Sequence, residues 1–124
     1  MKASIENEIR LDTLKQLVTE MAKAVGSECE VILHDVRNPE SSCIAISGNV
    51  TGRKIGAPMT DFGLRVLRLG DSAPNWMNYL STIGGKHLRS STVVIRDSKG
   101  KPSALVCINF DLSTLTLLRR FIDA

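Results

Sequence analysis

The strand-like segment at residues 102–111 constrains the fold more than any other part of the chain, because it is apolar on both sides. Successive side chains of an extended strand point to opposite faces. One face carries Ala104, Val106, Ile108 and Phe110, and the other carries Leu105, Cys107 and Asn109. A half-exposed antiparallel sheet would instead alternate apolar with polar residues. The sequence therefore predicts a sheet covered on both faces, by a short helix over residues 60–69 on one side and by the long N-terminal helix or another protomer on the other.

Hydrophobic periodicity predicts the remaining helices and strands. Apolar residues three and four positions apart predict a helix over residues 5–25, about 30 Å long. Its predicted apolar stripe consists of Ile9, Leu14, Leu17, Val18, Met21 and Val25. The short helix would begin at a Thr60 or Asp61 cap, and a final helix would cover residues 112–122, capped by Asp111 or Ser113. Strands are predicted at residues 29–36, 42–47, 76–83, 86–96 and 102–111. This order of elements predicts an α+β domain with a five-stranded antiparallel sheet.

The composition bounds the class of protein. A chain of 124 residues with 43% apolar residues suits one folded domain rather than a disordered segment. No run approaches the ~20 apolar residues of a membrane span, and residues 1–10 lack the apolar block of a secretory signal. Three cysteines without a C-x-x-C pair argue against a disulfide framework or a zinc site. We therefore expect reduced core cysteines in a cytoplasmic protein without membrane contact.

Charge and aromatic content argue against nucleic-acid recognition by these residues. The net charge is only +3, and acidic residues accompany the basic ones almost everywhere. A nucleic-acid module usually carries a basic stripe or a platform of aromatic side chains. The few aromatic residues here are too widely spaced to form one.

The reactive side chains give little support to an enzyme. His34 and His87 have no companions at metal-ligand spacing, and Asp35 next to His34 would point to the opposite face of a strand. The tripeptide at residues 61–63 spells the kinase magnesium motif, but the other kinase motifs are missing. The glycine-rich segment at residues 48–56 does not fit the P-loop pattern and is interpreted as a loop. We predict no enzymatic activity. An enzyme would require His34 and Asp61 to lie within hydrogen-bond reach of each other, at about 3 Å.

A set of polar residues in apolar surroundings suggests a functional site more strongly than these motifs do. Serine and threonine residues at 90–92 open an apolar strand, Asn109 lies in the apolar last strand, and Thr60 and Asp61 begin the short helix. Buried polar groups need hydrogen-bond partners. These side chains could satisfy one another within the core, or they could be the few polar groups of a small-molecule pocket.

An ordered set of segments resembles a known family. The segments are Leu33-His34-Asp35, residues 49–61 (NVTGRKIGAPMTD), residues 90–97 (SSTVVIRD) with Gly100, and residues 107–111 (CINFD). Together they closely resemble the YheO-like PAS domain family over about residues 30–111. The resemblance implies a PAS-like fold and a bacterial transcriptional regulator in which this domain senses and a C-terminal helix-turn-helix reads DNA. Because the sequence ends at Ala124, we expect DNA contact only through a helix-turn-helix domain absent from this chain.

The resemblance sharpens the functional prediction. We predict that residues 1–124 form one PAS-like sensor domain, with a helix at about 5–25, a sheet core at about 29–111 and a connector helix at about 112–122. It would bind a small molecule and signal through a homodimer; the alternative is a ligand-free dimerisation or protein-interaction module. The cofactor is left unassigned, and no metal site is expected. The candidate ligand-binding residues are His34, Arg53, Lys54, Thr60, Asp61, Ser91, Cys107 and Asn109.

Overall fold

A computed structural model describes residues 2–124 of the chain, with side chains from residue 5 onward. Its helices are α1 (Lys2–Val25), α2 (Asp61–Leu69) and α3 (Ser113–Asp123), and its strands are β1 (Cys29–Asp35), β2 (Cys43–Ser47), β3 (Trp76–Ile83), β4 (Lys86–Arg96) and β5 (Pro102–Asp111). Short 3₁₀ turns occur at Pro39–Ser41 and Gly70–Ser72. The α+β prediction is confirmed, and each strand begins and ends within one residue of its predicted bounds.

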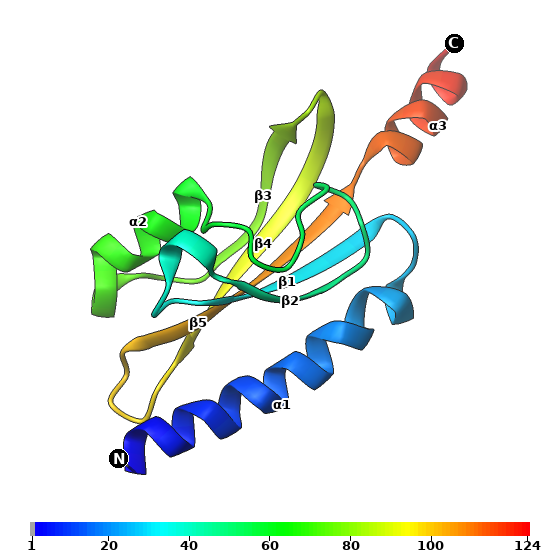
Figure 1. Ribbon diagram of the computed structural model, residues 1–124. Coiled ribbons are helices and arrows are strands. Elements are labelled where there is room, and N and C mark those ends of the chain that lie inside the picture. The colour runs from blue at the N-terminus through cyan, green and yellow to red at the C-terminus, as the bar shows by residue number, and fades with distance from the viewer. Residues whose placement is uncertain (1) are drawn as a thin grey trace.

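The five strands form one antiparallel sheet in the order β2-β1-β5-β4-β3. The last strand therefore lies in the centre, between the first hairpin and β4 (Figure 1). Its register aligns Glu30 of β1 with Asn109 and aligns Asn109 with Ser90 of β4. Ser90 in turn pairs with Tyr79 of β3. Because paired residues share a face, these four side chains form a row across the sheet.

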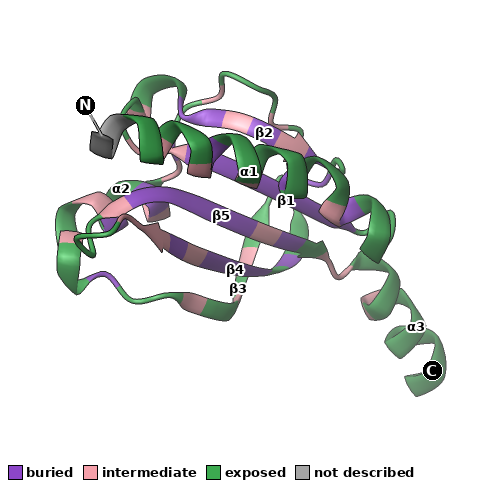
Figure 2. Ribbon diagram, turned by 90° about the horizontal axis from the view of Figure 1, so that it is seen from below, coloured by how far each residue is buried: buried purple, intermediate pink, exposed green. Residues whose placement is uncertain are grey.

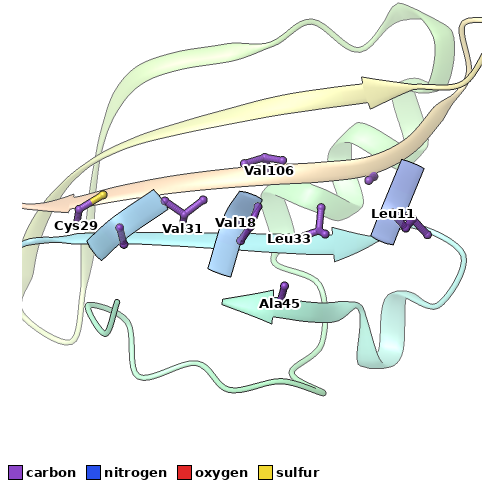
Figure 3. Close-up of a cluster of buried hydrophobic side chains, with 9 residues drawn as sticks. Leu11, Val18, Cys29, Val31, Leu33, Ala45 and Val106 are labelled. Atoms are coloured by element: carbon purple, nitrogen blue, oxygen red, sulfur yellow. The ribbon is translucent and has the colours of Figure 1, made fainter. Parts of the chain in front are cut away.

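Helix α1 covers one face of the sheet, over β1, β2 and β5 (Figures 1 and 2). The buried cluster between them contains Leu11, Val18, Ala22, Cys29, Val31, Leu33, Ala45, Ala104 and Val106 (Figure 3). The end of α1 is tied to β2 by Ser47 Oγ, which accepts a hydrogen bond of 3.0 Å from the Ala22 backbone N–H. This face is the main core of the domain.

The buried face of α1 differs from the predicted stripe. Leu14, Val18 and Met21 pack against the core as expected, but the stripe omitted Leu11 and Ala22. Ile9, Leu17 and Val25 are exposed by 57–60% of their area. The periodicity identified the helix correctly but misplaced its inner face, because apolar residues occur on more than one side of α1.

Helix α2 lies on the opposite side of the sheet from α1 (Figure 1). Val66 packs with Leu105 and Val94 in a second buried cluster. A Cβ at Gly63 would meet the side chains of Met59 and Leu105, so glycine lets the first turn approach the sheet closely. The Gly63 of the kinase-like tripeptide therefore has a packing role.

Helix α3 extends away from the sheet after β5 (Figure 1), and none of its residues is buried (Figure 2). Its start differs from the predicted cap, because Leu112 occupies the cap position without a side-chain hydrogen bond. Asp111 instead accepts from the backbone N–H and the hydroxyl of Ser113. The side of the sheet that faces α1 is also incompletely covered, since Met77 and Leu80 of β3 are 57% and 76% exposed.

Candidate functional site

A cavity of about 470 Å³ lies on the face of the sheet opposite α1. The floor comes from β1, β4 and β5, and the walls come from β3, the start of α2 and the segment at residues 51–60. The lining residues are Ile32, His34, Thr51, Arg53, Met59, Thr60, Asp61, Phe62, Tyr79, Ser81, Ile83, Ser90, Cys107 and Asn109. This volume is in the range of small-molecule pockets, and the lining mixes apolar side chains with a few polar ones.

The carboxylate of Glu30, which is fully buried, joins the covering loop to the sheet. Its Oε2 accepts hydrogen bonds from the backbone N–H groups of Val50 and Thr51, at 2.8 and 2.9 Å. Its Oε1 accepts from the Thr51 hydroxyl at 2.9 Å and from Asn109 Nδ2 at 3.0 Å. A buried carboxylate is tolerated when donors surround it in this way. The Glu30 side chain therefore ties the first residues of the loop after β2 to the sheet.

The polar row continues from Asn109 towards β3. The Ser90 hydroxyl donates a bond of 2.7 Å to Asn109 Oδ1, and Ser81 Oγ lies 3.5 Å from Ser90 Oγ. These bonds determine which way the Asn109 amide points, since its nitrogen must face Glu30 and its oxygen must face Ser90. Asn109, Ser90 and Ser81 of this row line the cavity, and Asn109 lies two residues before the end of β5.

His34 is fully buried and has one unsatisfied ring nitrogen. Its Nδ1 lies 2.7 Å from Ser42 Oγ, whereas Nε2 has no hydrogen-bond partner among the described residues. Burial, with a smaller contribution from the positive charge of Arg53, lowers the pKa of His34 to about 4. The imidazole is therefore neutral at physiological pH, and one nitrogen is left for another molecule.

Arg53 brings a positive charge to the cavity from the covering loop. It is half-buried, and its Nη1 donates a bond of 2.7 Å to the Pro58 carbonyl. No other side-chain hydrogen bond of Arg53 is found among the side chains of residues 5–124. Its remaining N–H groups are therefore free for a ligand.

Aromatic side chains form the apolar wall. Phe62 of α2 stacks on Tyr79 of β3, with ring centroids 4.6 Å apart and planes 9° apart, and meets Trp76 edge-on at 4.7 Å. The Tyr79 hydroxyl is hydrogen bonded to Thr92 Oγ1 at 2.9 Å. Burial, the largest influence on the Cys107 thiol, raises its pKa to about 11. Cys107 is therefore a neutral apolar part of the floor rather than a nucleophile.

Two predicted residues mark the beginning of α2. The Thr60 hydroxyl caps the helix by accepting a bond of 3.0 Å from the Gly63 backbone N–H. Asp61, the first helical residue, is exposed at the rim of the cavity. A carboxylate in the first turn is favourable for the helix dipole. Both residues therefore have structural roles besides lining the cavity.

The structure brings six of the eight predicted residues together in the cavity: His34, Arg53, Thr60, Asp61, Cys107 and Asn109. Lys54 is exposed and does not line it. Ser91 lies on the opposite face, where its Oγ accepts from the Asn78 backbone N–H at 2.9 Å. Ser90 takes the position in the cavity because it, and not Ser91, pairs with Asn109.

Sequence reasoning missed most of the walls and the residue that organises them. Phe62, Tyr79 and Ser81 come from segments whose placement depends on tertiary structure. Glu30 carried a usable signal, since it is the lone charge in the otherwise apolar run Cys29–Leu33 and shares the strand face of His34.

A metal site would need clustered ligand side chains, and an acid–base role would need the pair of His34 and Asp61. Among the described residues, no three His, Cys, Asp or Glu side chains gather as a metal site would require. No hydrogen bond among residues 2–124 joins His34 to Asp61, and Ser42 is the partner that His34 has. No helix in the same range is both long and apolar enough to cross a membrane.

An antiparallel sheet in this strand order, with a long helix on one face and a cavity under a short helix on the other, is the arrangement of a PAS-type domain. Comparison with family models makes the assignment specific. The chain belongs to the YheO-like PAS domain family, whose model matches residues 5–124.

Several curated proteins are related to the chain. YheO of Escherichia coli (strain K12) is 35% identical over 106 residues, which cover 82% of this chain and 44% of YheO. A Haemophilus influenzae protein is 34% identical over 109 residues, covering 86% and 49%. The transcriptional regulator DauR of Pseudomonas aeruginosa is 29% identical over 115 residues, covering 91% and 52%. The chain thus spans about half the length of these relatives. No solved structure gives a significant match.

Proposed function

We infer that this domain is a non-catalytic sensor of a bacterial transcriptional regulator, which binds a small molecule in the cavity and signals through a homodimer. The observation that carries the proposal is the ligand-sized cavity, lined by His34, whose buried Nε2 has no hydrogen-bond partner among the residues that the structure describes. The relationship to the regulator DauR supports the regulatory context. DNA contact would be made by another part of the regulator, because the charge of these residues is weak and scattered.

A route from the cavity to the terminal helix runs through β5. Asn109 lines the cavity and lies four residues before the start of α3. Asp111, between them, hydrogen bonds to Ser113 and so couples the end of the strand to the helix. A ligand that prefers one orientation of Asn109 would shift the population of α3 orientations.

The exposed apolar residues of α3 support a dimer. Five of its residues are 53–82% exposed in the single chain: Leu115, Leu117, Leu118, Phe121 and Ile122. A helix of 11 residues is marginal in water without tertiary contacts. An apolar patch of this kind is typical of an interaction surface. We therefore place the dimer contact on α3, with the exposed apolar residues of α1 and β3 as further candidates.

Native mass spectrometry, before and after mild denaturation, tests the proposal directly. It reports the number of subunits and any co-purified small molecule together. We expect a dimer with a bound mass, or, if the cavity empties during purification, a compound that raises the melting temperature in a thermal-shift screen.

A matched pair of variants assigns the binding to the cavity. Ser81→Phe places a ring in the cavity, whereas Thr82→Phe places the same ring on the exposed opposite face of β3. Only the first should abolish binding. A dimer that holds no compound, and gains no stability from any screened compound, would favour the alternative of a ligand-free dimerisation module.

A further inference from the structure

We propose that the cavity recognises a small monocarboxylate, whose carboxylate group is bound jointly by His34 Nε2–H and the Arg53 guanidinium. The inference rests on the proposed function, because it names the ligand chemistry of the same cavity. It is carried by two hydrogen-bond donors, His34 and Arg53, which line the same cavity and have N–H groups without an acceptor among the described residues.

Counting donors at Ser42 identifies the proton on His34. Ser42 is fully buried, and its hydroxyl has His34 Nδ1 as its hydrogen-bond partner at 2.7 Å. If Ser42 donates, both Ser42 and Nδ1 are satisfied, Nε2 carries the proton, and this N–H is the one group of the pair without a partner in the described chain. If Nδ1 donated instead, the serine proton and the Nε2 lone pair would both be unsatisfied in the core. Because a buried unsatisfied group is costly, the first arrangement is favoured, and His34 presents an N–H donor to the cavity.

Arg53 supplies the second donor and the charge. One of its N–H groups holds the Pro58 carbonyl, which anchors the side chain to its own loop. The others have no protein acceptor in the described chain. Arg53 is close enough for its charge to help lower the pKa of His34. A planar carboxylate can accept from the guanidinium and from the imidazole N–H at once.

The surroundings favour a single negative charge on an apolar body. Among the described side chains, Arg53 is the only cation lining the cavity, while Asp61 lies at its rim and Glu30 lies beneath the loop. A dianion such as a phosphate monoester would leave charge uncompensated. The remaining surface offers Ile32, Met59, Ile83 and the stacked pair Phe62 and Tyr79. That wall fits an aliphatic or aromatic group and not a second acidic one.

The test uses the ¹⁵N-labelled 124-residue chain and two pairs of probes, benzoate with benzamide and hexanoate with hexanamide. Each pair keeps the apolar body and exchanges the carboxylate for a neutral amide. Long-range ¹H–¹⁵N correlation first assigns the ring tautomer of His34 at neutral pH. Titrations then follow the His34 ring together with the backbone amides of Ser90 and Asn109.

We expect the Nε2–H tautomer, and tighter binding of each acid than of its amide. Arg53→Met should weaken the acids by roughly tenfold to hundredfold, the scale of a charge-assisted hydrogen bond. Lys54→Met is the matched control, since it removes a neighbouring exposed cation that lies outside the cavity. It should change affinity by no more than about twofold.

The possible failures are distinguishable. An Nδ1–H tautomer, equal binding of acids and amides, or unchanged acid affinity in Arg53→Met would overturn the carboxylate inference while leaving a ligand-binding cavity in place. If neither class of probe perturbs the cavity residues, the carboxylate inference is overturned, and the native mass spectrometry and thermal-shift screen decide the proposed function separately.

Discussion

Replacing Glu30 by alanine should destabilise the fold substantially, because one buried carboxylate is the common acceptor for the covering loop and β5. The substitution leaves two buried donors without partners, the Val50 backbone N–H and Asn109 Nδ2. Each unsatisfied buried group costs about 1–3 kcal/mol. Thr51 is half-buried, so water can replace its contacts, and removing the buried charge itself recovers part of the loss. We expect a net loss of about 2–4 kcal/mol, a large share of a typical domain's stability.

Glu30→Gln should cost much less. The new amide can keep its oxygen on the Val50 and Thr51 N–H groups and direct its nitrogen towards Asn109. Asn109 can then turn over, so that its oxygen accepts from the new amide and its nitrogen donates to Ser90. Only the charge-assisted strength of the bonds is lost, about 1 kcal/mol.

Urea unfolding followed by fluorescence of Trp76, the single tryptophan, measures both losses. Glu28→Ala, an exposed glutamate just before β1, is the control and should stay within about 0.5 kcal/mol of the parent. Asn109→Ala should cost less in the Glu30→Ala background than in the parent, with a coupling of about 1–2 kcal/mol. A loss below about 1 kcal/mol for Glu30→Ala, or strict additivity with Asn109→Ala, would refute the reasoning.

Three further predictions follow from single features of the structure. Because the pKa of His34 is about 4 when folded and near 6.5 when unfolded, stability should be constant above about pH 6.5 and fall by about 3 kcal/mol as the pH drops to 4. A pH series of urea titrations in which His34→Gln shows the same slope as the parent would contradict this. Gly48→Ala should be severely destabilising, since a Cβ at this position would collide with the Cys29 carbonyl. Gly52→Ala has the same φ of +77° but lies in open space, so it should cost about 1 kcal/mol. Equal melting temperatures of the two variants would disprove the steric explanation. Phe121→Ser should weaken the proposed dimer without changing the circular dichroism spectrum of the fold, because Phe121 is 82% exposed. An unchanged sedimentation equilibrium would contradict a dimer contact at this residue.

The candidate site shows where local reasoning stops. Asn109 could be singled out because a polar side chain in an apolar segment is conspicuous in the sequence, whereas His34 and Arg53 could be singled out because they lie in segments that resemble the family. The sequence analysis assigns Ser91, and not Ser90, to the site. In a strand, a shift of one residue moves the side chain to the other face of the sheet. The pairing of β4 with β5 decides it, and that pairing joins residues 19 positions apart.

The sequence by itself determined the elements of this protein, because helical and strand periodicity are local properties of neighbouring residues. It also determined that the central strand must be covered on both faces. Only the tertiary structure decided that Glu30 is buried, since the donors that make its burial tolerable come from a loop 20 residues later and from Asn109, 79 residues later. The tertiary structure likewise decided which side of α1 is its inner face, because several sides of that helix carry apolar residues and only contact with β1 and β2 distinguishes them.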